Sequence, residues 1–350
     1  MRSQHLKPQV IDHVLSSRRQ STNRLYDIRW RVWYDHCLSL SIDPLHPTVA
    51  EFAAFLTNLH ESKRLSAGTI AGYKSAIVST ISLARGVRSP NFSTSVVISH
   101  LLDGFRRATY SRTNLCPRWD ITVVLSFLRD HCEPLASVHM RLLTFKTVFL
   151  VAMATARRIS GIHAISGLPR DISFNKDLSS VTLNFLPEFR AKNQANSELS
   201  QSFSIPGLQA LLCPDDTDKF LCPVRALSIY LHRTKGIRHN KRRLFISLNP
   251  NYDRDVQKGT IVRWIRTLIQ LLFAQCASSL SPSSFRAHET RAIAASLAVD
   301  VGASLDSVMK MAFWKSETTF LNFYVRDVSQ QCLDNSFSLG PAVFAGHSSS

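Results

Sequence analysis

The sequence lacks the short motifs that mark several large classes of enzyme. It contains no G-x-x-x-x-G-K-[ST] and no G-x-G-x-x-G, so no loop is present that typically cradles nucleotide phosphates. It contains no H-E-x-x-H and no Asp/Glu cluster with metal-ligand spacing, which argues against a zinc hydrolase or a two-metal nuclease. We therefore expect a protein that needs no cofactor, neither a nucleotide nor a metal ion.

Cysteines and long apolar runs are also few. The seven cysteines are dispersed, odd in number and never spaced as C-x-x-C, which indicates a reducing intracellular compartment and no disulfide framework. The most apolar stretch, residues 142–156, contains Lys146 and is too short to span a bilayer. The first residues lack the apolar segment of a secretory signal. We expect no membrane partner.

Acidic residues are outnumbered: 25 Asp and Glu stand against 42 Lys and Arg, giving a formal charge of +17. Such a surplus favours a polyanionic partner. Residues 1–115 hold 15 Lys/Arg and 7 Asp/Glu, and the remainder holds 27 and 18. The positive charge is therefore spread over both halves, as expected for a protein that lies along its polymer or closes around it.

Helical periodicity dominates the N-terminal part of the chain. Apolar residues recur at helical spacing in residues 8–110, with start signals at Thr48 and Ser66, and the pattern predicts a small helical bundle. The predicted domains are a helical unit over residues 1–112, a linker over 113–117, a second domain over 118–335 and a loose tail over 336–350.

The second domain combines helices with a few short strands. Asp120 opens one predicted helix, and a long apolar helix covers about residues 137–156. Strand patterns occur at residues 171–174, 181–185, 202–205 and 244–246, with residues 187–200 as a long hairpin tip. The chain returns to helices from residue 260. The predicted fold class is mainly α with a small antiparallel β-sheet.

Several basic and aromatic residues could act together on a phosphodiester. Arg158, the second of two adjacent arginines, follows the long apolar helix, and a guanidinium there could bind phosphate. His288 and Arg291 are three residues apart on a predicted helix, so both should project from one face. Taken alone, each is more often an ordinary surface residue.

The remaining candidates have equally ordinary alternatives. Trp314 and Tyr324 are more often core aromatics, although a phenol beside guanidiniums can act as a nucleophile. Lys192, at the predicted hairpin tip, could reach a leaving oxygen, and Lys176 in the preceding turn competes for that role. The basic run at residues 235–243 could contact DNA, direct nuclear import or simply be solvated.

In order and spacing these residues resemble the tyrosine recombinase (phage integrase) family. The segment Arg158-Ile-Ser-Gly-Ile-His-Ala-Ile165 is similar to the first arginine box of the family, and His288-Glu-Thr-Arg291 to its second, H-x-x-R. Trp314 stands where the family has a second histidine or a tryptophan, and Tyr324 follows ten residues later in the nucleophile position. The sequence around Trp314 and Tyr324 is similar to that of recombinases of eukaryotic DIRS-like retrotransposons. The chain departs from the family at Gly161, where an acidic residue is usual.

The resemblance implies a fold and an activity. The fold would be a C-shaped clamp, with a helical core-binding (SAM-like) N-terminal domain and a mixed α/β catalytic domain. The activity would be site-specific cleavage and rejoining of double-stranded DNA through a 3′-phosphotyrosyl intermediate, without metal or ATP, to insert or excise a mobile element. The catalytic set would be Arg158, Lys192, His288, Arg291, Trp314 and Tyr324.

The resemblance also implies an assembly and a location: monomers in solution, a homo-tetramer on two synapsed DNA sites and, in a eukaryote, the nucleus. Two alternatives stay open from the sequence. A type IB topoisomerase would use the same chemistry to relax one duplex, and a domesticated DNA-binding protein would keep an idle site.

Overall fold

The computed structural model describes residues 7–86, 91–108, 119–189, 202–208, 217–249, 254–275, 286–300 and 302–312, with positions 314, 317, 320 and 321. The chain divides into two compact units, Met1–Thr113 and Asn114–Ser350. The linker and the tail predicted at residues 113–117 and 336–350 lie outside the described residues.

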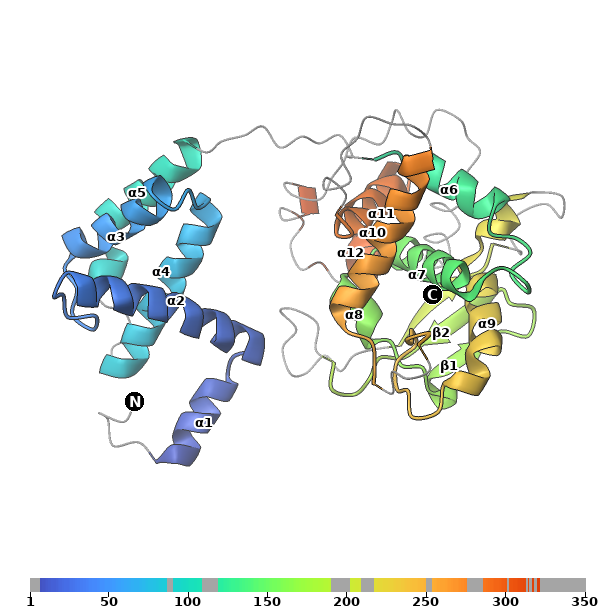
Figure 1. Ribbon diagram of the computed structural model, residues 1–350, viewed down its shortest axis with the longest axis horizontal. Coiled ribbons are helices and arrows are strands. Elements are labelled where there is room, and N and C mark those ends of the chain that lie inside the picture. The colour runs from blue at the N-terminus through green and yellow to red at the C-terminus, as the bar shows by residue number, and fades with distance from the viewer. Residues whose placement is uncertain are drawn as a thin grey trace. The chain divides into compact units, whose positions relative to one another are not determined.

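The first unit is a bundle of helices built around aromatic and branched aliphatic side chains. Figure 1 shows α2 crossing α4, the pair with the most extensive packing in this unit. Its elements are α1 (Pro8–Ser16), α2 (Gln20–Ser39), α3 (Val49–Glu61), α4 (Ala67–Arg85), the 3-10 helix η2 (Asn91–Thr94) and α5 (Val96–Ala108).

Local capping explains where two of these helices begin. The Thr48 side chain accepts a hydrogen bond from the Glu51 backbone N–H, and the Glu51 carboxylate accepts one from Thr48 N–H. The two residues form a capping box, which satisfies two backbone N–H groups at the start of α3. The Ser66 hydroxyl accepts from Thr69 N–H at the start of α4. Behind these caps the Trp33 ring is fully buried and packs edge-on against the Phe55 ring. The predicted bundle is confirmed.

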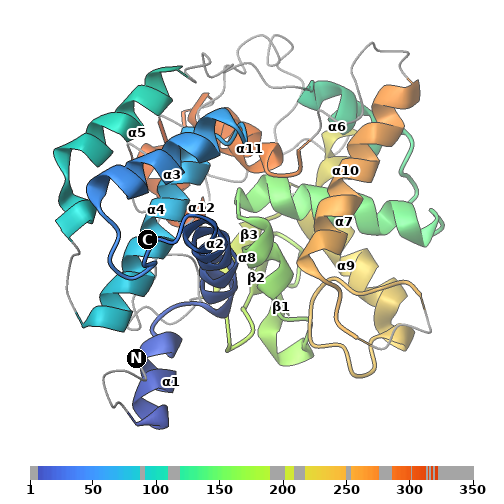
Figure 2. The same cartoon turned by 60° about the vertical axis from the view of Figure 1, so that its left-hand side comes forward.

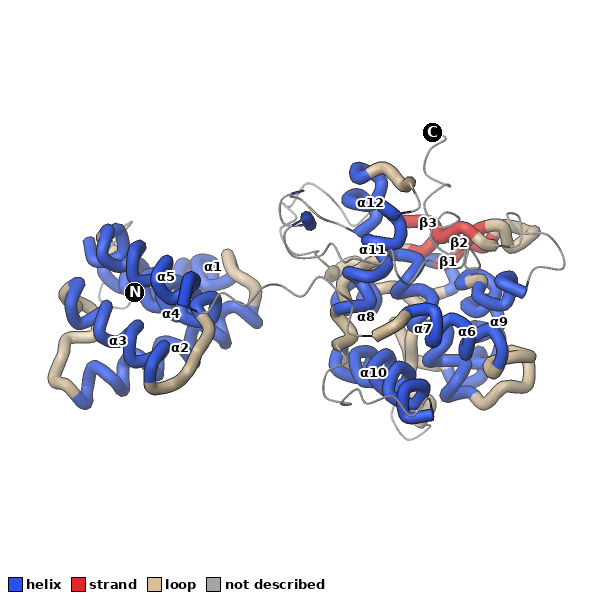
Figure 3. Tube along the Cα trace, turned by 90° about the horizontal axis from the view of Figure 1, so that it is seen from above, coloured by secondary structure: helices blue, strands red, loops and turns tan. Residues whose placement is uncertain are grey.

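The second unit surrounds one central helix, α7. Every residue of α7 from Leu143 to Thr155 is buried, because α8, α9, α10 and α11 all pack against it. Figure 3 shows α10 and the sheet on opposite sides of α7. The helices are α6 (Ile121–Asp130), α7 (Met140–Thr155), α8 (Ile159–Ala164), η3 (Pro169–Asp171), η4 (Thr217–Leu221), α9 (Pro223–Thr234), η5 (Lys235–Ile237), α10 (Lys258–Gln275), α11 (Glu289–Asp300) and α12 (Leu305–Ala312).

A small antiparallel sheet completes this unit. Its strands are β1 (Ile172–Phe174), β2 (Ser180–Leu183) and β3 (Phe203–Pro206), in the order β1-β2-β3. Val181 pairs with Ile205, and both side chains are buried on the face toward the core. The predicted fold class, mainly α with a small antiparallel sheet, is therefore confirmed.

The strand predicted at residues 244–246 is wrong. Leu244, Phe245 and Ile246 are buried, but the stretch forms only an isolated bridge, between Arg243 and Ser166, with the Leu244 N–H donating to the Ile165 carbonyl oxygen. The backbone N–H of Ile246 donates instead to the Tyr230 hydroxyl. A short apolar run indicates burial but not strand pairing. Here the residues pack in the core, and a side-chain hydroxyl accepts the hydrogen bond that a neighbouring strand would otherwise accept.

The basic run at residues 235–243 is partly built into the fold. Arg238 donates to the Thr234 hydroxyl and to the Leu244 carbonyl oxygen, each at 2.8 Å. Arg243 donates to the His163 carbonyl oxygen at 2.7 Å and forms an ion pair with Asp255. These two arginines thus hold this segment against α8 and α9, which the charge pattern alone does not indicate.

Candidate active site

Four of the six predicted site residues lie among the described residues: Arg158, His288, Arg291 and Trp314. Lys192 and Tyr324 lie outside them. Lys176, the alternative to Lys192, is exposed in the turn between β1 and β2.

The second arginine of the predicted set is held by the predicted tryptophan. Arg291 lies on α11 and is only 3% exposed, and its guanidinium carbon is 3.9 Å from the ring centroid of Trp314. Trp314 in turn packs against the buried ring of Phe320, with 4.7 Å between centroids. A desolvated cation–π contact of this kind contributes about 2 kcal/mol. The structure therefore brings together two residues that are 23 positions apart in the sequence.

The first arginine box forms a sharp corner between α7 and α8. Ala156 ends α7 in the left-handed region, at φ 44°, a conformation that glycine adopts most readily. Arg158 is then the N-cap residue of α8 and is half-buried, whereas the preceding Arg157 is 4% exposed. The corner thus turns one arginine into the core and leaves the other partly accessible.

Arg157 is a residue that the sequence reasoning did not include in the site. Burial, and next the positive charge of Arg291, lower the pKa of Arg157 to about 9. Its guanidinium therefore stays protonated at neutral pH and lies within electrostatic range of Arg291. The available signal was the Arg157–Arg158 pair itself, but the sequence does not show which of the two turns inward.

His288 departs from its expected setting. It lies in the turn directly before α11 and is exposed, whereas Arg291 is buried inside the helix. The structure therefore places only Arg291 of the pair inside the helix. The residues of α11 from Thr290 to Ser296 are all buried, so the first turns of this helix present no exposed face.

Gly161 stands where the family that the motifs resemble has an acidic residue, and its surroundings allow a side chain. A Cβ added there would meet Arg157 Cβ at 3.6 Å, an ordinary van der Waals distance. We expect Gly161→Ala to raise the free energy of unfolding by about 0.5–1 kcal/mol, because alanine loses less conformational entropy inside a helix.

Urea unfolding followed by circular dichroism measures this effect, with Gly167→Ala as the matched control. A Cβ at Gly167 would lie 2.3 Å from the Arg243 carbonyl oxygen, so that variant should be destabilised. Equal losses for both variants would contradict the packing described at Gly161.

The described part of the second unit thus concentrates positive charge in an apolar setting. Arg157 and Arg291 are both buried beside aromatic rings, and Arg158 lies at the same corner. Such a setting favours an anion such as a phosphodiester, because charge attraction is stronger where water is excluded. Within the described ranges, no group of three or more His, Cys, Asp or Glu residues could hold a metal ion. No helix within those ranges is long and apolar enough to cross a bilayer.

Comparisons with known proteins identify solved structures whose fold is similar to that of this chain. No protein-family model matches the chain, and no curated protein matches its sequence. A structure of the Tn1549 transposon integrase in complex with transposon right end DNA is 14% identical, with 93% of this chain and 95% of that chain covered and a TM-score of 0.58.

A second structure of that integrase, in complex with circular intermediate DNA, is 15% identical, with 82% and 83% covered and a TM-score of 0.50. The crystal structure of XerA recombinase is 15% identical, with 92% of each chain covered and a TM-score of 0.40. The chain therefore has the fold of the Tn1549 integrase, as the resemblance of its motifs predicts.

Proposed function

We propose that this chain is a tyrosine recombinase that cleaves and rejoins double-stranded DNA through a 3′-phosphotyrosyl intermediate. One observation carries the proposal. The H-x-x-R arginine, Arg291, is buried and stacked on Trp314, the residue that the motif places next along the chain. The integrase fold and the charge of +17 support the same conclusion.

In the proposed reaction the Tyr324 oxygen attacks the scissile phosphorus, and the bond to the 5′-oxygen breaks. Arg158 and Arg291 neutralise the charge that builds on the non-bridging oxygens, and the indole N–H of Trp314 donates to one of them. His288 accepts the tyrosine proton, and its exposure leaves it accessible to a DNA backbone. Lys192 protonates the leaving 5′-oxygen. Attack by a second 5′-hydroxyl on the phosphotyrosine reverses these steps, so no ATP is consumed.

The proposal extends to the partner, the assembly and the place of action. Double-stranded DNA is the substrate, held by phosphate contacts from both basic units and therefore bound less tightly as salt rises. Strand exchange requires two synapsed sites, so we propose a homo-tetramer that assembles on DNA from monomers. The substrate would be the ends of a mobile element and, in a eukaryotic cell, the reaction would take place in the nucleus.

Covalent trapping tests the proposal. Duplex DNA with randomised segments is incubated with the protein in a chelator, stopped with SDS and examined for protein–DNA adducts, and the linked peptide is identified by mass spectrometry. An adduct on the peptide that contains Tyr324 is the expected result. DNA binding without an adduct, on single and on paired sites, would contradict the enzymatic proposal. Relaxation of supercoiled plasmid without joining of two duplexes would indicate a topoisomerase instead.

Arg291 offers a second test. We expect Arg291→Ala to slow single-turnover cleavage by about 10²–10³-fold, the usual effect of removing one buried donor to a transition-state oxyanion. Arg291→Lys should recover only part of this loss, because an ammonium cannot reproduce the planar contact with Trp314. Gel-shift affinity and thermal unfolding serve as controls. Cleavage within a few-fold of wild type in a folded Arg291→Ala protein would remove Arg291 from the site.

A further inference from the structure

The basic run at residues 235–243 ends in a set of contacts with α8. Arg243 Nη1 donates to the His163 carbonyl oxygen at 2.7 Å, in the last turn of that helix. Arg243 Nε lies 3.4 Å from Asp255 Oδ2 and forms an ion pair with it. The Arg243 side chain thus connects the end of α8 to the segment that precedes α10.

The His163 ring is bound by the same part of the chain. Its Nε2 lies 2.8 Å from the Val256 carbonyl oxygen, which can only accept, so Nε2 carries the proton and donates. Burial, and next the charge of Arg243, lower the pKa of His163, so the imidazole is neutral at pH 7. The Leu244 backbone N–H also donates to the Ile165 carbonyl oxygen at 2.9 Å. Side-chain and backbone hydrogen bonds therefore join the end of α8 to a segment that is distant in the sequence.

These contacts affect Arg158 because α8 is too short to be stable by itself. It has six residues, and an isolated helix of that length does not persist in water. Arg158 is its N-cap residue, and the Arg158 carbonyl oxygen accepts the N–H groups of Gly161 at 2.7 Å and Ile162 at 3.1 Å. α8 packs against α7 and α10, as Figure 2 shows. A shift at the C-terminal end of α8 is therefore transmitted to Arg158 through about two turns of helix.

We infer that Arg243 is a positioning residue of the cleavage site, which fixes α8 and thereby the Arg158 guanidinium against the scissile phosphate. The inference rests on the proposed function, in which Arg158 binds that phosphate. The Arg243 guanidinium is bound to the His163 carbonyl oxygen and the Asp255 carboxylate, so it acts through the helix and not as a phosphate ligand. Displacement of a catalytic group by about 1 Å can slow a reaction by about 10²-fold.

A double-mutant cycle tests this role. The substrate is the duplex that wild-type protein captures in the trapping experiment, and the readout is the single-turnover rate of adduct formation at saturating protein. We expect Arg243→Met to slow this rate by about 10–100-fold in otherwise wild-type protein. In an Arg158→Ala background the same substitution should change the rate by less than about 3-fold, because the group that it misplaces is already absent. In an Arg291→Lys background the full factor should persist, because Arg158 is still present.

Two variants of His163 give a second readout, which also serves if Arg243→Met does not fold. His163→Leu removes the donor to the Val256 carbonyl oxygen, and its effect should depend on Arg158 in the same way. His163→Gln should recover most of the rate, because its amide N–H can donate to the same oxygen.

Arg233→Met is the matched control. Arg233 is half-buried like Arg243, and it donates to two backbone carbonyl oxygens, those of Leu135 at 2.8 Å and Val138 at 2.6 Å, which lie between α6 and α7. The substitution should change the rate of adduct formation by less than about 3-fold, with or without the Arg158 side chain.

Equal factors for Arg243→Met with and without the Arg158 side chain would show that Arg243 only stabilises the fold. That result, or no slowing at all, would overturn the inference while the proposed function stands. If wild-type protein forms no adduct, the proposed function fails and the inference fails with it. DNA affinity and thermal unfolding of each variant show that the rates compare folded, DNA-bound proteins.

Discussion

Replacing Tyr324 with phenylalanine is expected to abolish covalent capture of DNA and to leave DNA affinity unchanged. The substitution removes one oxygen, the atom proposed to bond to phosphorus, and keeps the ring. Binding depends on phosphate contacts spread over a basic surface, so the loss of one phenol should not weaken it. SDS-resistant adducts and gel-shift affinity, measured on the same duplex, give the two readouts.

The matched control is Tyr230→Phe. The Tyr230 hydroxyl is buried and accepts the backbone N–H of Ile246, so its loss should cost about 1 kcal/mol of stability without affecting cleavage. Adducts that persist in Tyr324→Phe would assign the nucleophile to another residue. Lost DNA binding in that variant would assign Tyr324 a packing role instead.

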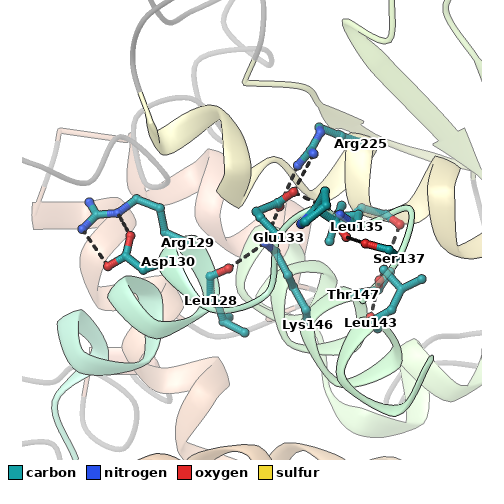
Figure 4. Close-up of polar contacts among 12 residues, drawn as sticks. Leu128, Arg129, Asp130, Glu133, Leu135, Ser137, Leu143, Lys146, Thr147 and Arg225 are labelled. Carbon is teal, nitrogen blue, oxygen red and sulfur yellow. Dashed lines mark hydrogen bonds and ion pairs between the residues drawn. The ribbon is translucent and has the colours of Figure 1, made fainter. Parts of the chain in front are cut away.

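The second large effect is expected on stability, at Glu133. Figure 4 shows its carboxylate between Lys146 and Arg225. Lys146 Nζ, on a side chain with no exposed surface, donates to Glu133 Oε1 at 2.8 Å and to the Leu128 carbonyl oxygen at 2.7 Å. Arg225 binds both carboxylate oxygens, at 2.8 and 2.7 Å. Glu133→Gln would leave the buried ammonium without its countercharge and should lower the free energy of unfolding by about 3–5 kcal/mol.

Urea unfolding of the variants measures this loss. Glu188→Gln is the control, since Glu188 pairs with Arg242 at the surface and should change stability by less than about 1 kcal/mol. The double variant Glu133→Gln/Lys146→Met should regain much of the loss, because the uncompensated charge is removed as well. A double variant no more stable than Glu133→Gln would show that the carboxylate acts through Arg225 alone.

The pH dependence has a definite sign. Burial raises the pKa of Glu133, but hydrogen bonds from Arg225 and Lys146 outweigh it and hold that pKa below its ordinary value. A depressed carboxylate pKa stabilises the folded state above the unfolded pKa of about 4.3. This contribution is lost as the pH falls from there through the lower folded pKa, and Glu133→Gln should remove that part of the acid dependence.

The sequence was most informative where local chemistry decides the structure. The starts of α3 and α4 follow from Thr48 and Ser66, whose side chains bond to backbone groups within three residues. The strand predicted at residues 244–246 is wrong because an apolar run indicates burial but not the hydrogen-bond partners, and here the N–H of Ile246 donates to the Tyr230 hydroxyl and not to a strand. Partners distant in sequence are not encoded in local periodicity.

The site shows the same division. Arg291 and Trp314 could be named from motif spacing, and the structure stacks them. The motif named Arg158 alone, and local periodicity did not show that Arg157 is the arginine of the pair that is buried, at the corner after the left-handed Ala156. His288 was expected on a helix, but α11 begins one residue later, at Glu289.

The burial of α7 determines how its backbone amides can reach solvent when the second unit unfolds. Its residues from Leu143 to Thr155 are all buried, and the hydroxyls of Thr147 and Thr155 donate to carbonyl oxygens of the preceding turn, those of Leu143 and Val151. No local fraying of a surface can admit water to this helix. Its amide hydrogens can therefore exchange with solvent only when the whole unit unfolds, so their exchange rates report the global stability of the domain. Lys146 lies near the middle of this same helix, and the Arg157 corner follows its C-terminal end.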